Sequence, residues 1–161
     1  MKISSWIKGF AKSEKYKNNI FSFDMLGEGA RTLEDAEKYF EDYKSSIHHV
    51  GNDLHNSSDI KYANGVSIKI SALHPRYERN KIEDLEKELL PKLVKLCEIS
   101  KQYNIQLCID AEENYRLILS LKILDKLSSN RSLLGWNGLG LAVQAYQKRA
   151  FYVIDWLDKL A

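Results

Sequence analysis

Hydrophobic and polar residues alternate in four short stretches of the chain. In residues 105–112, Leu107 and Ile109 fall on one face of an extended backbone, and Cys108 and Asp110 fall on the other. The same alternation recurs in residues 20–26, 66–71 and 139–145. Each stretch predicts a strand with one hydrophobic face, and each has polar or charged side chains at or near its carboxyl end.

An amphipathic helix follows each of these strands. The first helix starts at a segment similar to a capping box, residues 32–35, in which Asp35 replaces the usual Glu or Gln. In the second helical stretch, Pro91 is expected to restart the helix as a first-turn residue. The four predicted helices begin near Thr32, Ile82, Tyr115 and Arg149. Strands that alternate with helices in this way call for a parallel sheet with right-handed crossovers.

The predicted fold class is therefore α/β, with four consecutive βα units that make up half of a (β/α)8 TIM-like barrel. The chain has 161 residues, whereas a complete barrel of this kind typically needs about 250. Residues 20–161 form the partial barrel in this interpretation. Residues 1–19 form a basic leader with a short helical segment, either solvated or in contact with anionic lipid or another chain.

The composition of the chain limits the kinds of partner and the cellular compartment that we expect for it. Lys and Arg number 24 and Asp and Glu 22, a net charge of +2 that gives no reason to expect a nucleic-acid partner. The two cysteines, Cys97 and Cys108, lack the spacing of metal ligands, so we expect no metal site and reduced thiols. No stretch is apolar enough to span a bilayer and no signal peptide is visible. We expect a cytoplasmic protein, at most peripheral at the inner membrane face.

Candidate chemistry gathers at the strand ends. The parallel strands of a sheet lie about 4.8 Å apart, so side chains at their carboxyl ends should converge on one rim. The residues at these ends are Asp24, Lys69, Asp110 and Gln144. Small side chains precede them on the same face, which leaves space for a large planar ligand. In the alternative interpretation, Lys69 pairs with Asp24 or Asp110 only to neutralise buried charge.

Four long motifs resemble one enzyme family. They are FSFDMLGEGART, GVSIKISALHPRYE, IDAEEN.R and GWNGLGLAVQAYQKRA, of which the parts SALHPRYE and VQAYQKRA are especially specific. From about residue 20 to its last residue, the chain is similar to the proline dehydrogenase domain of the bacterial proline utilisation A flavoenzymes. The resemblance implies an FAD-dependent enzyme that oxidises L-proline to pyrroline-5-carboxylate and passes electrons to a membrane quinone.

The resemblance also implies roles for individual residues. By motif, Lys69 matches an active-site lysine that contacts the flavin, Asp110 and Ala111 match positions beside the flavin, and Gln144 matches a contact to the flavin ring. On the substrate side, the matching residues are Asp24, Glu28 and Tyr146. The implied catalytic set is therefore Lys69, Asp110, Asp24, Glu28 and Tyr146, and the implied cofactor-binding set is Lys69, Asp110, Ala111 and Gln144.

The family's barrel continues through four more strand–helix units, which carry an arginine pair for the substrate carboxylate. The chain stops after the fourth helix, so we expect a fragment that is weakly active or inactive alone and that needs a second chain to complete the barrel. One alternative is a non-catalytic remnant or self-associating half barrel without flavin. Another is an unrelated α/β-barrel enzyme, such as an aldolase that uses Lys69 as a Schiff base.

Overall fold

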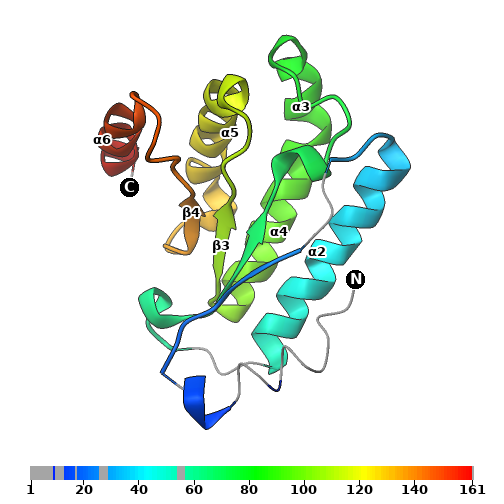
Figure 1. Ribbon diagram of the computed structural model, residues 1–161. Coiled ribbons are helices and arrows are strands. Elements are labelled where there is room, and N and C mark those ends of the chain that lie inside the picture. The colour runs from blue at the N-terminus through cyan, green and yellow to red at the C-terminus, as the bar shows by residue number, and fades with distance from the viewer. Residues whose placement is uncertain (1–8, 10–12, 17, 26–28, 54–56, 161) are drawn as a thin grey trace.

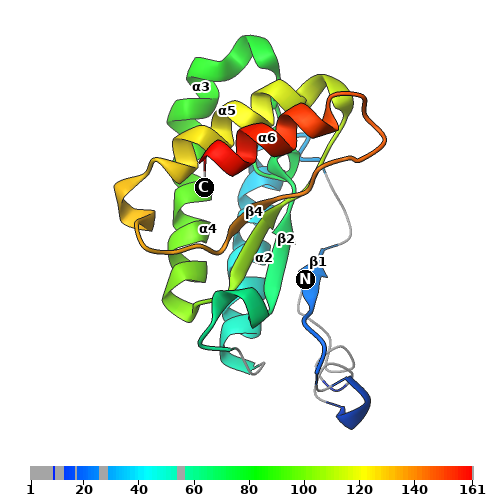
Figure 2. The same ribbon diagram turned by 90° about the vertical axis from the view of Figure 1, so that its left-hand side faces the viewer.

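The computed structural model describes residues 9, 13–16, 18–25, 29–53 and 57–160. Its four-stranded sheet is parallel throughout, and the strands lie in the order in which they occur along the chain. The helices cover one face of this sheet (Figures 1 and 2). The strands are β1 (Ser22–Asp24), β2 (Gly65–Ile68), β3 (Gln106–Ile109) and β4 (Leu139–Leu141). The predicted fold class, a run of βα units in a barrel-like order, is confirmed.

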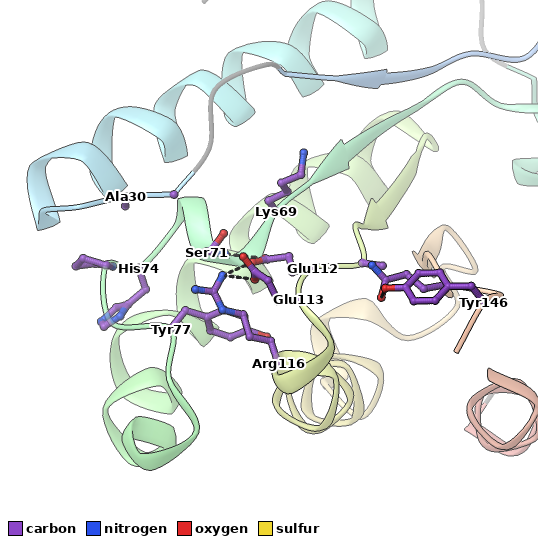
Figure 3. A pocket seen from close by; sticks show the side chains of 13 residues that line it. Ala30, Lys69, Ser71, His74, Tyr77, Glu112, Glu113, Arg116 and Tyr146 are labelled. Carbon is purple, nitrogen blue, oxygen red and sulfur yellow. Dashed lines mark hydrogen bonds and ion pairs between the residues drawn. The ribbon is translucent and has the colours of Figure 1, made fainter. Parts of the chain in front are cut away.

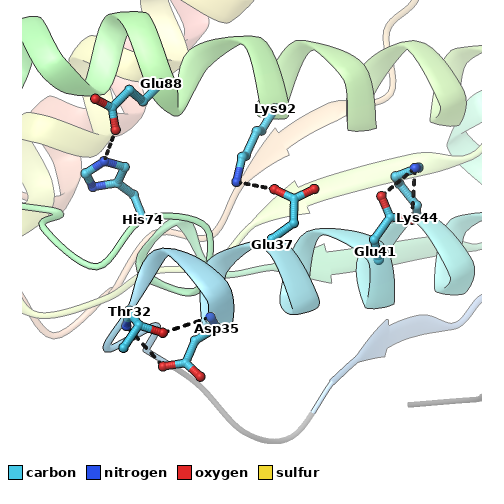
Figure 4. Close-up of polar contacts among 8 residues, drawn as sticks. All are labelled: Thr32, Asp35, Glu37, Glu41, Lys44, His74, Glu88 and Lys92. Carbon is cyan, nitrogen blue, oxygen red and sulfur yellow. Dashed lines mark hydrogen bonds and ion pairs between the residues drawn. The ribbon is translucent and has the colours of Figure 1, made fainter.

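Five α-helices connect and follow these strands. They are α2 (Leu33–Asp53), α3 (Ile82–Glu88), α4 (Leu90–Tyr103), α5 (Leu117–Ser128) and α6 (Ala150–Leu160). The predicted capping box before α2 is present, because Thr32 Oγ1 accepts from the Asp35 amide and Asp35 Oδ2 accepts from the Thr32 amide, each at 3.0 Å (Figure 4). Pro91 lies in the first turn of α4, as predicted.

The hydrophobic core lies between the sheet and its helices. Val66 pairs with Leu107 and Ile68 pairs with Ile109 across β2 and β3, and all four side chains are fully buried. Ser67 and Cys108, which pair with each other on the opposite face, are small. The alternation in the sequence therefore identified the two faces correctly. Polar contacts at the surface also join the helices, as between Glu37 of α2 and Lys92 of α4 (Figure 4).

The strands are shorter than the sequence pattern predicts. β2 ends at Ile68 and is followed by a short 3-10 helix, η3 (Ile70–Ala72), and β4 ends at Leu141. After β2 the alternation runs on past the paired residues because Lys69 is still in an extended conformation before η3 begins. Lys69 and Gln144 consequently lie just beyond their strands. No helix in the described ranges is long and apolar enough to cross a bilayer.

The remaining 3-10 helices are η1 (Glu14–Tyr16), η2 (Ile60–Tyr62), η4 (Arg79–Lys81), η5 (Asn114–Arg116) and η6 (Arg131–Leu133). Most of the predicted basic leader, residues 1–19, lies outside the described residues. Within its described part, η1 is the one helical turn that spans three residues. α2, with 21 residues, is the longest of the described helices and continues to Asp53.

Candidate active site

Lys69 lies between two carboxylates at the carboxyl end of the sheet. Its Nζ is 3.4 Å from Asp110 Oδ2 and 3.6 Å from Asp24 Oδ2. The three residues come from the ends of the neighbouring strands β1, β2 and β3, so the predicted convergence is confirmed for them. The Lys69 and Asp110 side chains are only 16% and 20% exposed, whereas Asp24 is 43% exposed. The ion pair with Asp110 is therefore the better shielded of the two.

Hydrogen bonds from the core hold this group in place. The Lys69 amide donates to the hydroxyl of Tyr43, which α2 brings under the end of β2, at 3.0 Å. Burial raises the pKa of Tyr43 to about 12, so this hydroxyl stays protonated at neutral pH. Ser67 Oγ donates to Asp110 Oδ1, and the Asp110 amide donates to the Ile68 carbonyl at 2.8 Å. Lys69 is thus held through its backbone by α2, and Asp110 is held by β2.

A cavity of about 590 Å³ opens beside this group (Figure 3). Its lining includes three of the predicted site residues in addition to Lys69, namely Ala111, Gln144 and Tyr146. Asp110 lines a smaller hollow that shares Ala111 and Gln144 with this cavity. Lys69, Asp110 and Gln144 thus border one region of the molecule, whereas Asp24 lines neither of these spaces and joins the group through its contact with Lys69. Glu28, the remaining predicted residue, lies outside the described residues.

Gln144 and Tyr146 lie in the loop between β4 and α6. Gln144 Oε1 accepts hydrogen bonds from the side-chain amide of Gln147 and, at 3.3 Å, from the Tyr146 hydroxyl. These contacts orient the Gln144 amide and leave its NH₂ group as a donor. Tyr146 is highly exposed, so its ring borders the mouth of the cavity.

The opposite end of the cavity holds a polar cluster that sequence analysis did not assign to the site. Glu112 Oε2 accepts from Arg116 Nη1 at 2.7 Å, and Glu112 Oε1 accepts from the Ser71 amide at 2.9 Å. Tyr77 lines the same end. Glu112 precedes the helical turn η5 that contains Arg116, so the helical i, i+4 rule does not predict this pair. The bond to Ser71 joins distant parts of the chain and leaves no local pattern.

Comparison with known proteins identifies the family. Residues 7–161 match the proline dehydrogenase family. The chain is 46% identical over 151 residues to the bifunctional protein PutA of Klebsiella aerogenes and 44% identical over 151 residues to that of Rhizobium meliloti. Each alignment covers 94% of this chain, but only 11% and 12% of the respective relatives.

Solved structures agree with this result. A crystal structure of a Bradyrhizobium japonicum proline utilization A variant matches with a TM-score of 0.83 and 47% identity, over 88% of this chain and 14% of that chain. The Bdellovibrio bacteriovorus protein matches with a TM-score of 0.84 at 18% identity, over 96% of this chain and 17% of that chain, which shows the shared fold. The chain thus spans about one ninth of the length of the curated relatives that it matches. The chain belongs to the proline dehydrogenase family.

Proposed function

We propose that this chain supplies the first half of the active site of an FAD-dependent proline dehydrogenase, which oxidises L-proline to pyrroline-5-carboxylate. One observation carries the proposal: Lys69 is held between Asp24 and Asp110 at the ends of three parallel strands, beside an open cavity. The carboxyl ends of the strands are where α/β barrels place their catalytic groups. Family membership supplies the reaction class.

The residues around the cavity are compatible with a bound flavin. Cavities of about 300–1,000 Å³ are typical of cofactor and small-molecule sites, and this one has a volume of about 590 Å³. The open face of the sheet carries the small residues Ser67, Cys108 and Gly140, which leave room for a planar group. We assign the FAD contacts to Lys69, Asp110, Ala111 and Gln144. When bound, FAD supplies the acceptor for the hydride that leaves proline.

Lys69 acts in this proposal as a fixed cation. The two carboxylates at 3.4 and 3.6 Å favour its charged form, and low exposure strengthens its interaction with any group that enters the cavity. The ammonium can donate hydrogen bonds toward the flavin, and the Gln144 NH₂ group can donate to the polar edge of the ring. Because the Lys69 side chain is held in position before the substrate arrives, substrate binding requires little reorganisation of the site.

Asp24, Glu28 and Tyr146 are assigned to the substrate side. Of the two carboxylates beside Lys69, Asp24 is more exposed than Asp110. It therefore remains accessible to the ring nitrogen of proline. That amine must be unprotonated when the hydride leaves, and a nearby carboxylate can orient the amine as its proton departs. The assignments of Glu28 and Tyr146 rest on their motifs alone.

The partners of the reaction follow from the family resemblance. We infer that a membrane quinone takes the electrons, with the protein at the inner face of the membrane. β1 and β4 are the two edges of the described sheet, and edge strands present unpaired backbone groups. In the proposed enzyme, further strands pair with both edges and complete the barrel, and a second chain is one source of them.

The same two edges favour one alternative function. A parallel half barrel with two open edges can associate with a second copy of itself, edge to edge, without binding flavin. Phe151 and Tyr152 of α6, next to β4, are highly exposed aromatic residues, and such residues are enriched at protein interfaces. This alternative predicts a colourless, inactive dimer.

Purification of the chain with added FAD distinguishes the two functions. The proposal predicts bound flavin with its two visible absorption bands and weak dye reduction that requires proline. Both signals should weaken in Lys69→Met, whereas substitution of the surface lysine Lys95 by Met serves as the matched control. A colourless protein that forms a dimer and reduces no dye would contradict the proposal and support the self-associating half barrel.

A further inference from the structure

The backbone of Ser71 joins the three loops that carry the charged group of the site. Its carbonyl accepts a hydrogen bond from the Ala30 amide at 3.0 Å, and its own amide donates to Glu112 Oε1 at 2.9 Å. Ala30 follows β1, Ser71 follows β2 and Glu112 follows β3. Lys69 begins the loop that holds Ser71, and Asp110 begins the loop that holds Glu112, so the Ser71 backbone couples the positions of these two residues.

Glu112 is the side chain that completes this coupling. It is only 6% exposed, although it lines the cavity. One carboxylate oxygen accepts from the Ser71 amide and the other accepts from Arg116 at 2.7 Å (Figure 3). Because both oxygens have donors, this carboxylate is suited to holding its neighbours and not to taking a proton from a substrate.

Arg116 is itself held firmly enough to orient Glu112. Its guanidinium carbon lies 5.5 Å from the ring centres of Tyr77 and Tyr115, a cation–π distance. Tyr77 is buried, and its hydroxyl is 2.8 Å from the Ser120 hydroxyl. Arg116 also lies 3.0 Å from Glu113, whose side chain is 56% exposed. Of these neighbours, Tyr77 is buried and Tyr115 and Glu113 are exposed, and the buried Nε of Arg116 has no hydrogen-bond partner among the described residues.

We propose that Glu112 is a positioning residue, which acts through the Ser71 amide to hold Lys69 between its two carboxylates. Ser71 is two residues from Lys69, and the intervening segment starts the short helix η3. A shift of the Ser71 backbone therefore moves the lysine directly. The consequence of this role for catalysis rests on the proposed function. The effect of Glu112 on the position of Lys69 does not.

Lysine labelling tests the proposal without flavin or proline. The chain is treated with an amine-reactive reagent, and mass spectrometry compares the labelling rate of Lys69 with that of the exposed Lys95 in the same sample. In Glu112→Ala, the Lys69 rate relative to Lys95 should rise by roughly threefold or more, because local opening releases the side chain from its carboxylates. Glu112→Gln should show a smaller rise, since an amide oxygen can still accept from Ser71.

Glu113→Ala is the matched control, because it removes the other acidic partner of Arg116 without touching Ser71, and its Lys69 rate should stay unchanged. Protection of the fully buried Cys97 from alkylation confirms that each variant is folded. If Glu112→Ala does not fold, Glu112→Gln provides the comparison. An unchanged Lys69 rate in the folded Glu112 variants, or an equal rise in Glu113→Ala, would overturn the proposal. The proposed function would stand or fall separately, by the flavin and proline measurements.

Discussion

Lys69 Nζ lies 3.4 Å from Asp110 Oδ2, at the ends of the neighbouring strands β2 and β3. The parallel register brings the two residues together, and Ser67 of the same β2 strand donates to the other oxygen of that carboxylate. Asp110 is therefore held by Ser67 of β2 and by Lys69, the residue directly after β2. Asp24 meets Lys69 at 3.6 Å from a more exposed position, so the two carboxylates are not equivalent.

The first prediction concerns the difference in exposure between Asp110 and Asp24. In the enzyme with its barrel completed, Asp110→Asn removes the shielded charge beside Lys69, and we expect proline-dependent dye reduction to fall by about 100-fold, as when a preorganised electrostatic partner is lost. Asp24→Asn should have a smaller effect on turnover and should act mainly on the KM for proline. Steady-state kinetics with varied proline measure both parameters. Equal losses in the two variants would contradict the assignment of separate roles.

The second prediction concerns the support under Lys69. Tyr43→Phe removes the hydroxyl that accepts the Lys69 amide at 3.0 Å in a buried environment. The amide then lacks its partner, and we expect the free energy of unfolding to fall by about 1–3 kcal/mol. Urea denaturation followed by circular dichroism measures the change. Tyr62→Phe, at an exposed tyrosine, is the control and should stay within about 0.5 kcal/mol of the wild type. Equal values for the two variants would be evidence against a structural role for the Tyr43 hydroxyl.

The third prediction is a loss of stability in alkaline solution. Burial raises the pKa of Tyr43 from 10.0 to about 12, and burial also raises the pKa of Tyr77. Between pH 10 and 12 the unfolded chain therefore binds fewer protons than the folded chain, so the free energy of unfolding falls as the pH rises. Denaturation midpoints across this range measure the slope, and the slope should be shallower in Tyr43→Phe than in the wild type. A slope that Tyr43→Phe leaves unchanged would show that this hydroxyl is not the source.

The fourth prediction compares two glycines of the sheet. A Cβ at Gly65 would lie 2.7 Å from Gln106 Cβ and 2.8 Å from its backbone oxygen, whereas a Cβ at Gly140 would lie 3.9 Å from Cys108 Sγ. Gly65→Ala should therefore lower the free energy of unfolding by about 1–3 kcal/mol through overpacking. Gly140→Ala should be tolerated, because 3.9 Å is an ordinary contact. Thermal denaturation of both variants provides the test, and a more stable Gly65→Ala protein would show that β2 and β3 can separate at this point.

The residue pattern by itself determined the order of strands and helices and the two faces of the sheet. Val66, Ile68, Leu107 and Ile109 alternate with small or polar residues, and the structure buries them all on the helix side. Such alternation reports burial directly, because successive side chains of a strand point to opposite faces. The motifs likewise pointed to Lys69, Asp24 and Asp110, which the structure brings together.

Only the tertiary structure decided what fixes those residues in place. The Tyr43 hydroxyl reaches the Lys69 amide from α2, and Glu112 reaches the Ser71 amide from the loop after β3. Both are contacts between a side chain and a distant backbone group, which any residue type at positions 69 and 71 except proline could provide. Periodicity records which side chains are buried, but a backbone amide has the same chemistry at every such position. Its partner is therefore defined only when the packing of helices and loops is known.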